Sequence, residues 1–353
     1  MPSPVFSAAR IAAPAPSSLP QHTPLVAAIR DGLVESVHYG SAIALDADGS
    51  MLAAAGDPAT PFYPRSSLKP LQAVAMIRAG LELPADLLAL AAASHSGAAE
   101  HRDGALRILE MHGLSVTDLE NSTDLPYGGA EREDWLRTGG RATQLTQNCS
   151  GKHAAMAATC VINGWPVQGY LHPQHPLQQL VRSTVIELAG EEPPAVSTDG
   201  CGTPLFALTL GGMARAFGRI AQAASSAAGD DDGGAEAAVG LAMQQHPEMV
   251  AGEGRDVTAL MRLLPGAVAK DGFEGVQLVG LPDGRAVAVK ISDGGDRARM
   301  PASVSLLEAI GLDTAALADI ATAPVLGGGH QVGLLQATDF LSNSLSKPDN
   351  EAL

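Results

Sequence analysis

The stretch RSSLKPLQAVAMIRAG, residues 65–80, decides the fold because it marks a helix that begins directly after a pair of strands. Apolar residues recur at helical spacing from Leu68 to Ile77, and a glycine at position 80 is typical of a helix end. The stretch therefore predicts a helix that begins near Ser66 and ends at Gly80.

Strand signals lie on both sides of this helix in the sequence. Residues 41–56, SAIALDADGSMLAAAG, hold two apolar runs around Asp48-Gly49, where glycine accepts the positive φ of a hairpin turn. From about residue 84 to 261 the pattern is mostly helical, and residues 223–238, AASSAAGDDDGGAEAA, indicate a mobile surface loop. Strand character then returns in three segments: 276–280, 286–291 and 332–336.

This order of elements predicts an α+β fold, in which one antiparallel sheet is built from both ends of the chain and packs against a mostly helical region. No second sheet and no internal repeat are indicated. We expect a disordered leader over residues 1–22, a single domain over 23–340 that contains the helical insertion, and a flexible tail over 341–353.

Charge and composition exclude some classes of partner. The 22 Lys and Arg residues against 38 Asp and Glu give a net charge of −16, which would repel nucleic acid and an anionic membrane surface. Three cysteines, Cys149, Cys160 and Cys201, are too few for a disulfide framework and suit a reducing compartment. The N-terminal residues lack the apolar run of an export signal, so we expect a cytoplasmic protein.

Ser66 and Lys69 form a Ser-x-x-Lys pattern at the start of the expected helix. Residues three apart share one helix face, so the amine can reach the hydroxyl, and a neutral lysine can activate a serine as a nucleophile. The alternative is a capping serine followed by a surface lysine. Because Ser344 and Lys347 repeat the spacing without a following helix, the pattern alone does not decide between the two.

Two further polar segments suggest partners for this pattern. In SHSGAAEH, residues 94–101, small residues around Ser96 would let a ligand approach closely, although a capped turn has the same composition. Lys270 lies just before the second hairpin and could enter the same pocket from the sheet edge. Two lysines in one pocket would each lower the other's pKa, whereas the alternative is an exposed turn lysine.

Two cysteine-containing segments suggest a ligand or metal site. The segment QNCSGKHAAMAATC places Cys149, Lys152 and His153 in the first turn of a helix, and STDGCGTP places Asp199 and Cys201 in a glycine-rich loop. The two thiols could share a soft metal such as zinc. Their spacing is not that of a zinc finger, and two buried thiols are the alternative.

Taken together, these segments resemble the asparaginase II family, the type first associated with rhizobia and distinct from the threonine-dependent bacterial asparaginases. The resemblance covers about residues 34–333. The segments that carry it are VESVHYG, RSSLKPLQA, SHSGAAEH, NCSGKHAAM, GYLHPQHPLQ, TDGCGTP and AKDGFEGV. The family is similar in fold to serine β-lactamases and serine-dependent glutaminases, which agrees with the strand order.

The resemblance implies roles for individual residues. It implies two serine–lysine pairs, Ser66 with Lys69 as nucleophile and base, and Ser96 with Lys270. It also implies a zinc ion held by Cys149, Lys152 and Cys201, where the lysine amine must lose its proton to offer a lone pair. The residues expected around the substrate are Arg65, His95, Asp199 and Gly200, with His153 also at a family position.

Two positions depart from the family pattern. Ala98 stands where an acidic residue is expected after His-Ser-Gly, which could alter how the substrate or the metal is supported. In VLGGGHQVG three glycines replace an expected turn with asparagine, a change expected to affect only a strand connection.

The implied activity is hydrolysis of L-asparagine to L-aspartate and ammonia through an acyl-enzyme, by a homodimer as is usual in the family. A glutaminase and a β-lactamase-type serine acyl hydrolase are the enzymatic alternatives. A non-catalytic module that binds amides or zinc is the alternative from another class.

Overall fold

The computed structural model describes residue 15 and residues 19–227 and 234–341 of the 353-residue chain. Most of the expected leader and tail therefore lies outside the described residues. Within the expected leader, however, His22 is described, and its Nδ1 lies 3.0 Å from the Ser41 hydroxyl on the sheet.

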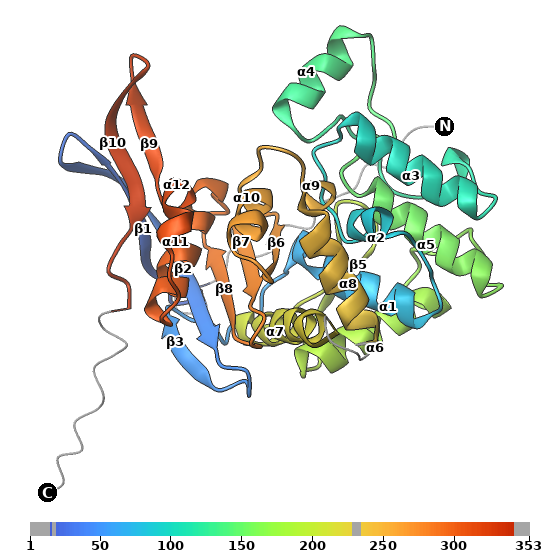
Figure 1. Cartoon of the computed structure of the whole chain (residues 1–353), viewed down its shortest axis with the longest axis horizontal. Helices are drawn as coiled ribbons and strands as arrows, with labels where there is room; N and C mark the ends of the chain where they lie inside the picture. Colours follow the sequence, from blue (N-terminus) through green and yellow to red (C-terminus); the bar gives the residue numbers. More distant parts are fainter. Residues whose placement is uncertain (1–14, 16–18, 228–233, 342–353) are drawn as a thin grey trace, which may run out of the picture.

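A large antiparallel sheet forms one side of the molecule, with strands in the order β6-β7-β8-β2-β1-β10-β9 and β3 beside β2 (Figure 1). The strands are β1 (Thr23–Arg30), β2 (Leu33–Leu45), β3 (Met51–Ala55), β6 (Val268–Gly272), β7 (Val276–Gly280), β8 (Ala286–Ile291), β9 (Ala323–Gly327) and β10 (His330–Ala337). Strands from the two ends of the chain meet where β2 pairs with β8 and β1 with β10. The prediction of an α+β fold with one sheet built from both chain ends is confirmed.

Three strands of this sheet, and a second sheet, were not expected from the sequence. β1, β6 and β9 lack a long run of alternating apolar residues, and β6 even carries Lys270 and Asp271 at buried positions. The expectation of no second sheet is wrong, since β4 (Val196–Thr198) and β5 (Pro204–Phe206) pair as a small hairpin. Its strands are only three residues long, too short for a periodic signal.

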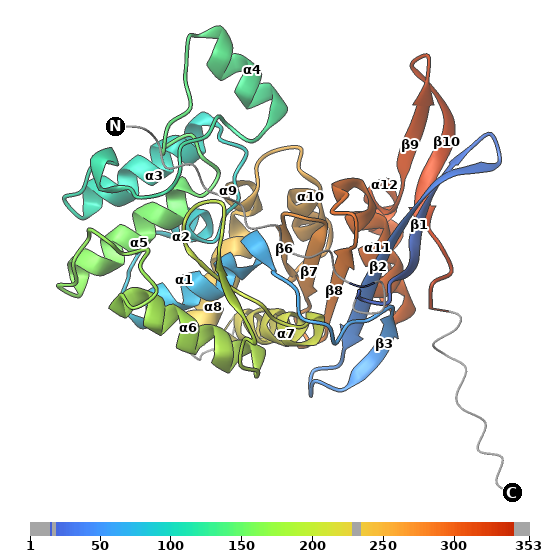
Figure 2. The same cartoon turned by 180° about the vertical axis from the view of Figure 1, so that it is seen from behind.

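Most of the helices fill the other side of the molecule, as Figure 2 shows from behind, although the last two, α11 (Arg299–Ala309) and α12 (Ala318–Ala321), lie on the side of the sheet. The others are α1 (Lys69–Arg78), α2 (Ala85–Ala91), α3 (Ala99–Met111), α4 (Gly129–Arg137), α5 (Ser150–Ile162), α6 (Pro176–Ala189), α7 (Leu210–Ala227), α8 (Gly234–Gln245), α9 (Pro247–Val250) and α10 (Asp256–Leu263). The described residues also form four short 3₁₀ segments, of which η2 (Arg65–Leu68) concerns the site. The core is continuous between α1, α7 and the sheet.

The expected surface loop over residues 223–238 is largely helical. Helix α7 continues to Ala227 and α8 begins at Gly234, because alanine is the strongest helix former and both segments are rich in it. Residues 228–233 lie outside the described residues.

The predicted helix after the first hairpin is present, with a different start. Residues Arg65 to Leu68 form the 3₁₀ turn η2, and the α-helix begins at Lys69 with a proline in its first turn, which suits that position. Ser66 therefore lies on a tight turn at the helix entrance rather than inside the helix.

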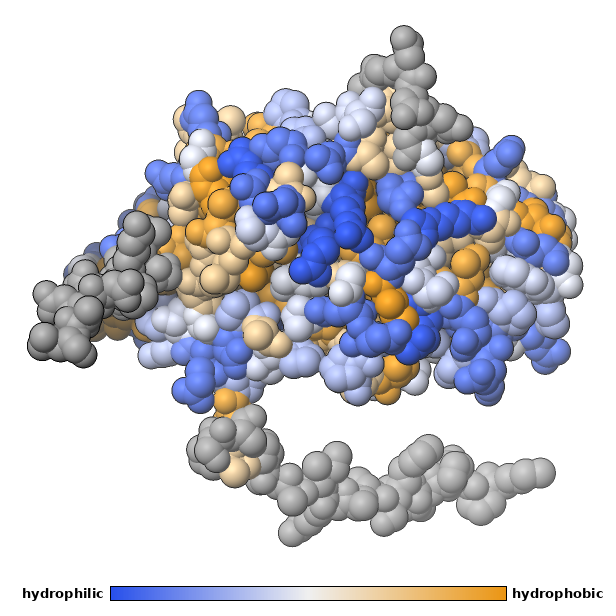
Figure 3. All heavy atoms as spheres, turned by 90° about the horizontal axis from the view of Figure 1, so that it is seen from below, coloured by the Kyte–Doolittle hydropathy of each residue, from blue (hydrophilic) through white to orange (hydrophobic). Residues whose placement is uncertain are grey.

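The surface is mixed in polarity. On the face in Figure 3, hydrophilic side chains gather near the middle and hydrophobic ones lie scattered around them. Within the described ranges, no helix is both long enough and apolar enough to cross a bilayer.

Candidate active site

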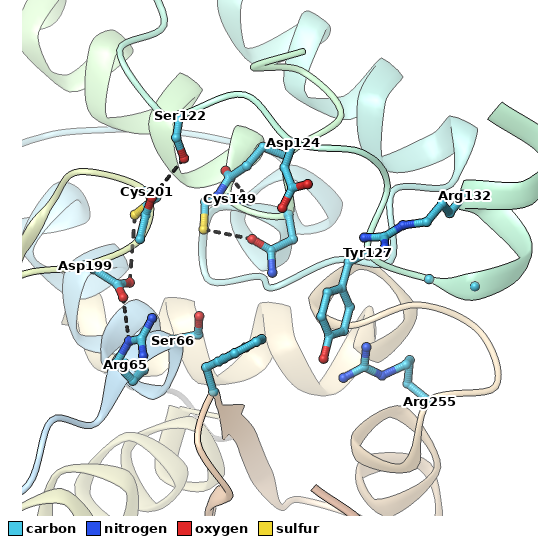
Figure 4. Close-up of a pocket in the computed structure, with 16 residues that line it drawn as sticks. Arg65, Ser66, Ser122, Asp124, Tyr127, Arg132, Cys149, Asp199, Cys201 and Arg255 are labelled. Carbon is cyan, nitrogen blue, oxygen red and sulfur yellow. Dashed lines mark hydrogen bonds and ion pairs between the residues drawn. The ribbon is translucent and has the colours of Figure 1, made fainter. Parts of the chain in front are cut away.

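A cavity of about 680 Å³ opens where η2, the start of α5, the β4–β5 turn and the segment before α4 meet (Figure 4). Six residues singled out in the sequence line it: Arg65, Ser66, Cys149, Asp199, Gly200 and Cys201. The structure thus brings together segments that lie more than 130 residues apart in the chain. Lys69, His95, Ser96, Lys152 and Lys270 are buried behind its walls.

Arg65 fixes the turn that carries Ser66. Its φ of +54° is unusual for a residue with a side chain, and such a conformation persists only where contacts impose it. Its Nε donates to Asp199 Oδ1 at 2.7 Å, and its guanidinium lies 5.5 Å from the centre of the Phe273 ring. These contacts hold η2 so that the partly exposed Ser66 faces the cavity.

Lys69 reaches a serine that the sequence analysis did not select. Its buried Nζ donates to the Ala93 carbonyl oxygen at 2.6 Å and to Ser94 Oγ at 2.8 Å. Ser94 also lines a narrow recess together with Ser66. The signal in the sequence was weak, because Ser94 and Ser96 flank the same histidine and only the path of the chain distinguishes them.

The second predicted pair, Ser96 with Lys270, is not joined by a hydrogen bond. The Ser96 hydroxyl is buried without a hydrogen-bond partner among the described residues, while its backbone donates to the Ala251 carbonyl and accepts from Gly128. Lys270 Nζ donates instead to Asp271, to its carbonyl oxygen at 2.8 Å and to its carboxylate. Through these two backbone hydrogen bonds, Ser96 connects its own segment with the segments around Gly128 and Ala251.

Lys270 has an altered basicity. Burial, together with the charge of Lys69, lowers its pKa to about 8 against the opposing effect of Asp271. The charge of Lys69 thus lowers the pKa of Lys270, which is the direction expected for two lysines in one pocket.

His95 does not line the cavity, so its expected contact with the substrate is corrected. Its ring is fully buried, its Nε2 lies 2.9 Å from Ser150 Oγ, and its backbone N–H donates to the Asn148 carbonyl. His95 therefore holds the turn before α5 in place. A sequence pattern cannot distinguish such a support from a binding residue.

The three residues expected to bind zinc converge from two segments. Lys152 Nζ lies 3.2 Å from Cys201 Sγ and 3.0 Å from Thr203 Oγ1, and both Cys149 and Cys201 are buried. A hydrogen bond from Cys149, together with the charge of Lys152, holds the pKa of Cys201 well below its ordinary value. Two sulfurs, which are common zinc ligands, and one amine therefore lie together beside the cavity.

The set of Cys149, Lys152 and Cys201 differs from the usual metal site of a protein because it includes a lysine. Among the described residues, no group of three or more His, Cys, Asp or Glu side chains is arranged to hold a metal ion. The zinc site depends on a lysine, and it stays a prediction. The cysteines are free thiols, as the sequence analysis allowed.

Three other residues singled out in the sequence, His153, Gly200 and Ala98, have well-defined contacts in the structure. His153 is buried behind Lys152, with Nδ1 2.8 Å from the Tyr170 hydroxyl, and burial lowers its pKa to about 4. The Gly200 carbonyl accepts a hydrogen bond from Ser122 at 2.9 Å, which ties the β4–β5 turn to the opposite wall. Ala98 directly precedes α3, and its N–H donates to His101 Nδ1 in the first turn of that helix.

The glycine-rich departure near the C-terminus affects a strand connection, as expected. Gly328 and Gly329 have positive φ angles in the turn between β9 and β10, where Gly327 pairs with His330. This hairpin is remote from the residues that line the cavity.

Sequence reasoning missed Tyr127, Arg255 and Phe273, which also line the cavity. Tyr127 and Arg255 lie in segments without a recognisable motif, whereas Phe273 lies in AKDGFEGV, where only Lys270 was selected. The Arg255 guanidinium lies 4.8 Å from the centre of the Tyr127 ring. Only the fold brings them to the wall opposite the cysteines.

Several solved structures are similar to the chain at low identity. Mglu in its native form is 15% identical, with a TM-score of 0.37 over 78% of this chain and 66% of that one. The glutaminase YbgJ of Bacillus subtilis, in covalent complex with 5-oxo-L-norleucine, is 14% identical, with a TM-score of 0.34 over 80% of this chain and 90% of that one. A β-lactamase from Mycobacterium bovis is 16% identical, with a TM-score of 0.35 over 77% of this chain and 95% of that one.

The chain thus spans just under two thirds of the length of Mglu. No curated protein matches the sequence. The family model for L-asparaginase II matches residues 26–337, which is most of the chain and includes every segment that forms the cavity. The chain belongs to the L-asparaginase II family.

Proposed function

We propose that this protein is a serine amidohydrolase that hydrolyses L-asparagine to L-aspartate and ammonia. The observation that carries the proposal is the cavity that presents Ser66 at its floor, with Lys69 and Ser94 hydrogen-bonded behind it. Membership of the L-asparaginase II family supports the same reaction. The expected homodimer and cytoplasmic location belong to this proposal.

In the proposed reaction the Ser66 oxygen attacks the carbon of the side-chain amide, and the Lys69 amine takes the hydroxyl proton directly or through Ser94. The backbone N–H of Ser66 stabilises the negative oxygen that forms. The C–N bond then breaks, and ammonia leaves with the proton that Lys69 returns. Water cleaves the resulting ester to give aspartate and restore Ser66.

The test is a pair of neighbouring serine variants. Ser66→Ala is expected to abolish ammonia release from asparagine while the thermal unfolding midpoint stays close to wild type. Ser67→Ala is the matched control, because the Ser67 hydroxyl is buried and donates to the Pro64 carbonyl at 2.7 Å, away from the cavity. Near-normal turnover in Ser66→Ala would contradict the assignment.

Substrate choice needs its own comparison. Ammonia release from asparagine and from glutamine, with cleavage of a chromogenic β-lactam measured in parallel, separates asparaginase, glutaminase and β-lactamase activities. Asparagine is expected to be the preferred substrate. Asparagine binding without any turnover would favour a non-catalytic binding module instead.

In the same proposal, zinc is held by Cys149, Lys152 and Cys201, where it would supply a positive charge that orients the substrate. Metal analysis of protein purified without chelator is expected to find one zinc per chain. Cys149→Ala is expected to lower the zinc content and raise KM more than it lowers kcat. Protein without stoichiometric zinc would remove the metal from the proposal.

A further inference from the structure

Arg255 lies directly before α10, and its side chain reaches the cavity wall beneath Tyr127 (Figure 4). In this view Ser66 and Asp199 lie toward one side of the cavity, whereas Tyr127 and Arg255 lie toward the other. The Arg255 side chain is 18% exposed, so it is mostly withdrawn from solvent but open to a bound ligand.

Arg255 shares its carboxylate partner with a second cation. The Asp271 carboxylate accepts a hydrogen bond from Arg255 Nη2 at 2.9 Å and also binds the Lys270 amine, so one negative charge is shared between two cations. Asp256, the next residue in the chain, is bound at 3.0 Å by Arg299. Arg299 is also paired with Asp296 at 3.3 Å, whereas Arg255 has to share its carboxylate partner and can still attract an anion.

Two other arginines also line the cavity, in different environments. Arg132 is exposed and donates to the Pro126 carbonyl oxygen at 2.9 Å. Arg65 has the Asp199 carboxylate as its own partner at 2.7 Å, so its charge is already neutralised. Arg255 is thus the better candidate for binding a negatively charged group of a ligand.

Arg255 also has unused donors. A guanidinium carries five N–H groups, and in the described part of the chain the side-chain hydrogen bonds of Arg255 end at Asp271. The Tyr127 ring, 4.8 Å from the guanidinium, restricts the orientation of its plane. A fixed planar fork with free N–H groups matches a carboxylate through two parallel hydrogen bonds.

We propose that Arg255 binds the α-carboxylate of the substrate, and that Asp271 acts as a positioning residue that holds the guanidinium. This inference rests on the proposed function, since it assigns the substrate class of the same cavity. The protein would then select amides that carry a free carboxylate, such as a free amino acid, over amides without one.

The test measures binding in the absence of turnover. Ser66→Ala protein and the Ser66→Ala/Arg255→Gln double variant are titrated by calorimetry with L-asparagine and with 3-aminopropanamide, which keeps the amine and the amide but lacks the carboxylate. The loss of Arg255 is expected to weaken asparagine binding at least ten-fold and to change binding of the analogue less than two-fold. Arg255→Lys, which keeps the charge without the fork, should be intermediate.

Arg262→Gln in the same background is the matched control, because Arg262 lies on α10, the helix that Arg255 directly precedes, with an exposed side chain bound to Glu253. It should leave both affinities unchanged, and thermal unfolding verifies that each variant is folded. Asparagine affinity within two-fold of the parent in the Arg255→Gln variant, an equal loss for both ligands, or no asparagine binding by the parent would each overturn the inference. Arg255-dependent binding in a wild-type protein that releases no ammonia would instead overturn only the proposed function.

Discussion

Ser66 and Ser67 are adjacent in the chain but have opposite environments. Ser66 lines the cavity, whereas the fully buried Ser67 hydroxyl is engaged by the Pro64 carbonyl within η2. The spacing to Lys69 correctly indicated which serine reaches the cavity. It did not indicate the hydrogen-bond partner of Lys69, because Ser94 arrives there only through the packing of α2 against α1.

Replacing Ser94 tests whether this contact matters for the reaction. Ser94→Ala removes a hydroxyl that accepts a hydrogen bond from Lys69, and we expect kcat for asparagine to fall at least ten-fold. Ser96→Ala serves as the comparison, since its hydroxyl has no hydrogen-bond partner in the described structure, and it should retain most activity. A larger loss in Ser96→Ala than in Ser94→Ala would restore the sequence-based choice of Ser96.

Lys270 should make stability depend on pH. Because burial lowers its pKa from 10.5 to about 8, the unfolded chain binds more protons than the folded one between these values. The free energy of unfolding contributed by Lys270 therefore rises with pH across this window, by on the order of 3 kcal/mol.

Urea unfolding of wild type and Lys270→Met between pH 7.5 and 10.5 measures this contribution. Wild type should gain stability relative to the variant as pH rises, while other groups that titrate in both proteins cancel. A difference that does not change with pH would show that Lys270 is solvated in the native protein.

At the scale of elements, the start of α5 is positioned by its close approach to α2. Gly151 lies against Leu90, and an added Cβ would lie 2.8 Å from the Leu90 carbonyl oxygen and contact its side chain. Backbone cannot yield as a flexible side chain can, so a larger residue would move α5 away. Cys149 and Lys152, which flank this contact, are thereby held at the cavity.

Gly151→Ala is expected to lower the free energy of unfolding by about 1–3 kcal/mol, through overpacking, and to reduce activity by displacing the start of α5. Gly211→Ala in α7 is the control, because a Cβ there meets atoms only at 3.7 and 3.8 Å, in ordinary contact. Its stability should stay within about 0.5 kcal/mol of wild type. Chemical denaturation and asparagine turnover of both variants check this, and a stable, active Gly151→Ala protein would contradict it.

At the scale of the whole molecule, the site depends on strand β6 reaching the first helix from the far end of the chain. Gly272 at the end of β6 lets the Pro64 carbonyl approach so closely that no Cβ would fit, which brings η2 against the sheet. Lys270 and Asp271 are therefore buried beside the site although they follow Ser66 by about 200 residues.

Local stability should differ strongly across this architecture. Every residue of β7 is buried, whereas no residue of α4 is, and α4 lies at the edge of the molecule (Figure 1). Hydrogen exchange measured by mass spectrometry should therefore find amides of α4 exchanging at least 100-fold faster than those of β7 and β8. Equal protection of α4 and β7 would mean that α4 is held by contacts that this structure lacks.

The sequence by itself determined the local features of this protein. Glycine turns, helical spacing and apolar runs predicted both hairpins, the helix after Ser66 and the sheet drawn from both ends of the chain. The cysteine and lysine segments indicated most of the cavity wall, because their side-chain chemistry is unusual enough to mark them.

Only the tertiary structure decided which of these side chains meet. Ser94 rather than Ser96 binds Lys69, His95 supports a turn, and Tyr127 and Arg255 complete the cavity. Each of these outcomes depends on how distant segments pack, and packing distances of a few ångströms are not encoded in local spacing. β6 shows the same limit, since Asp271 pairs with its neighbour Lys270 and also with the distant Arg255, which no local pattern contains.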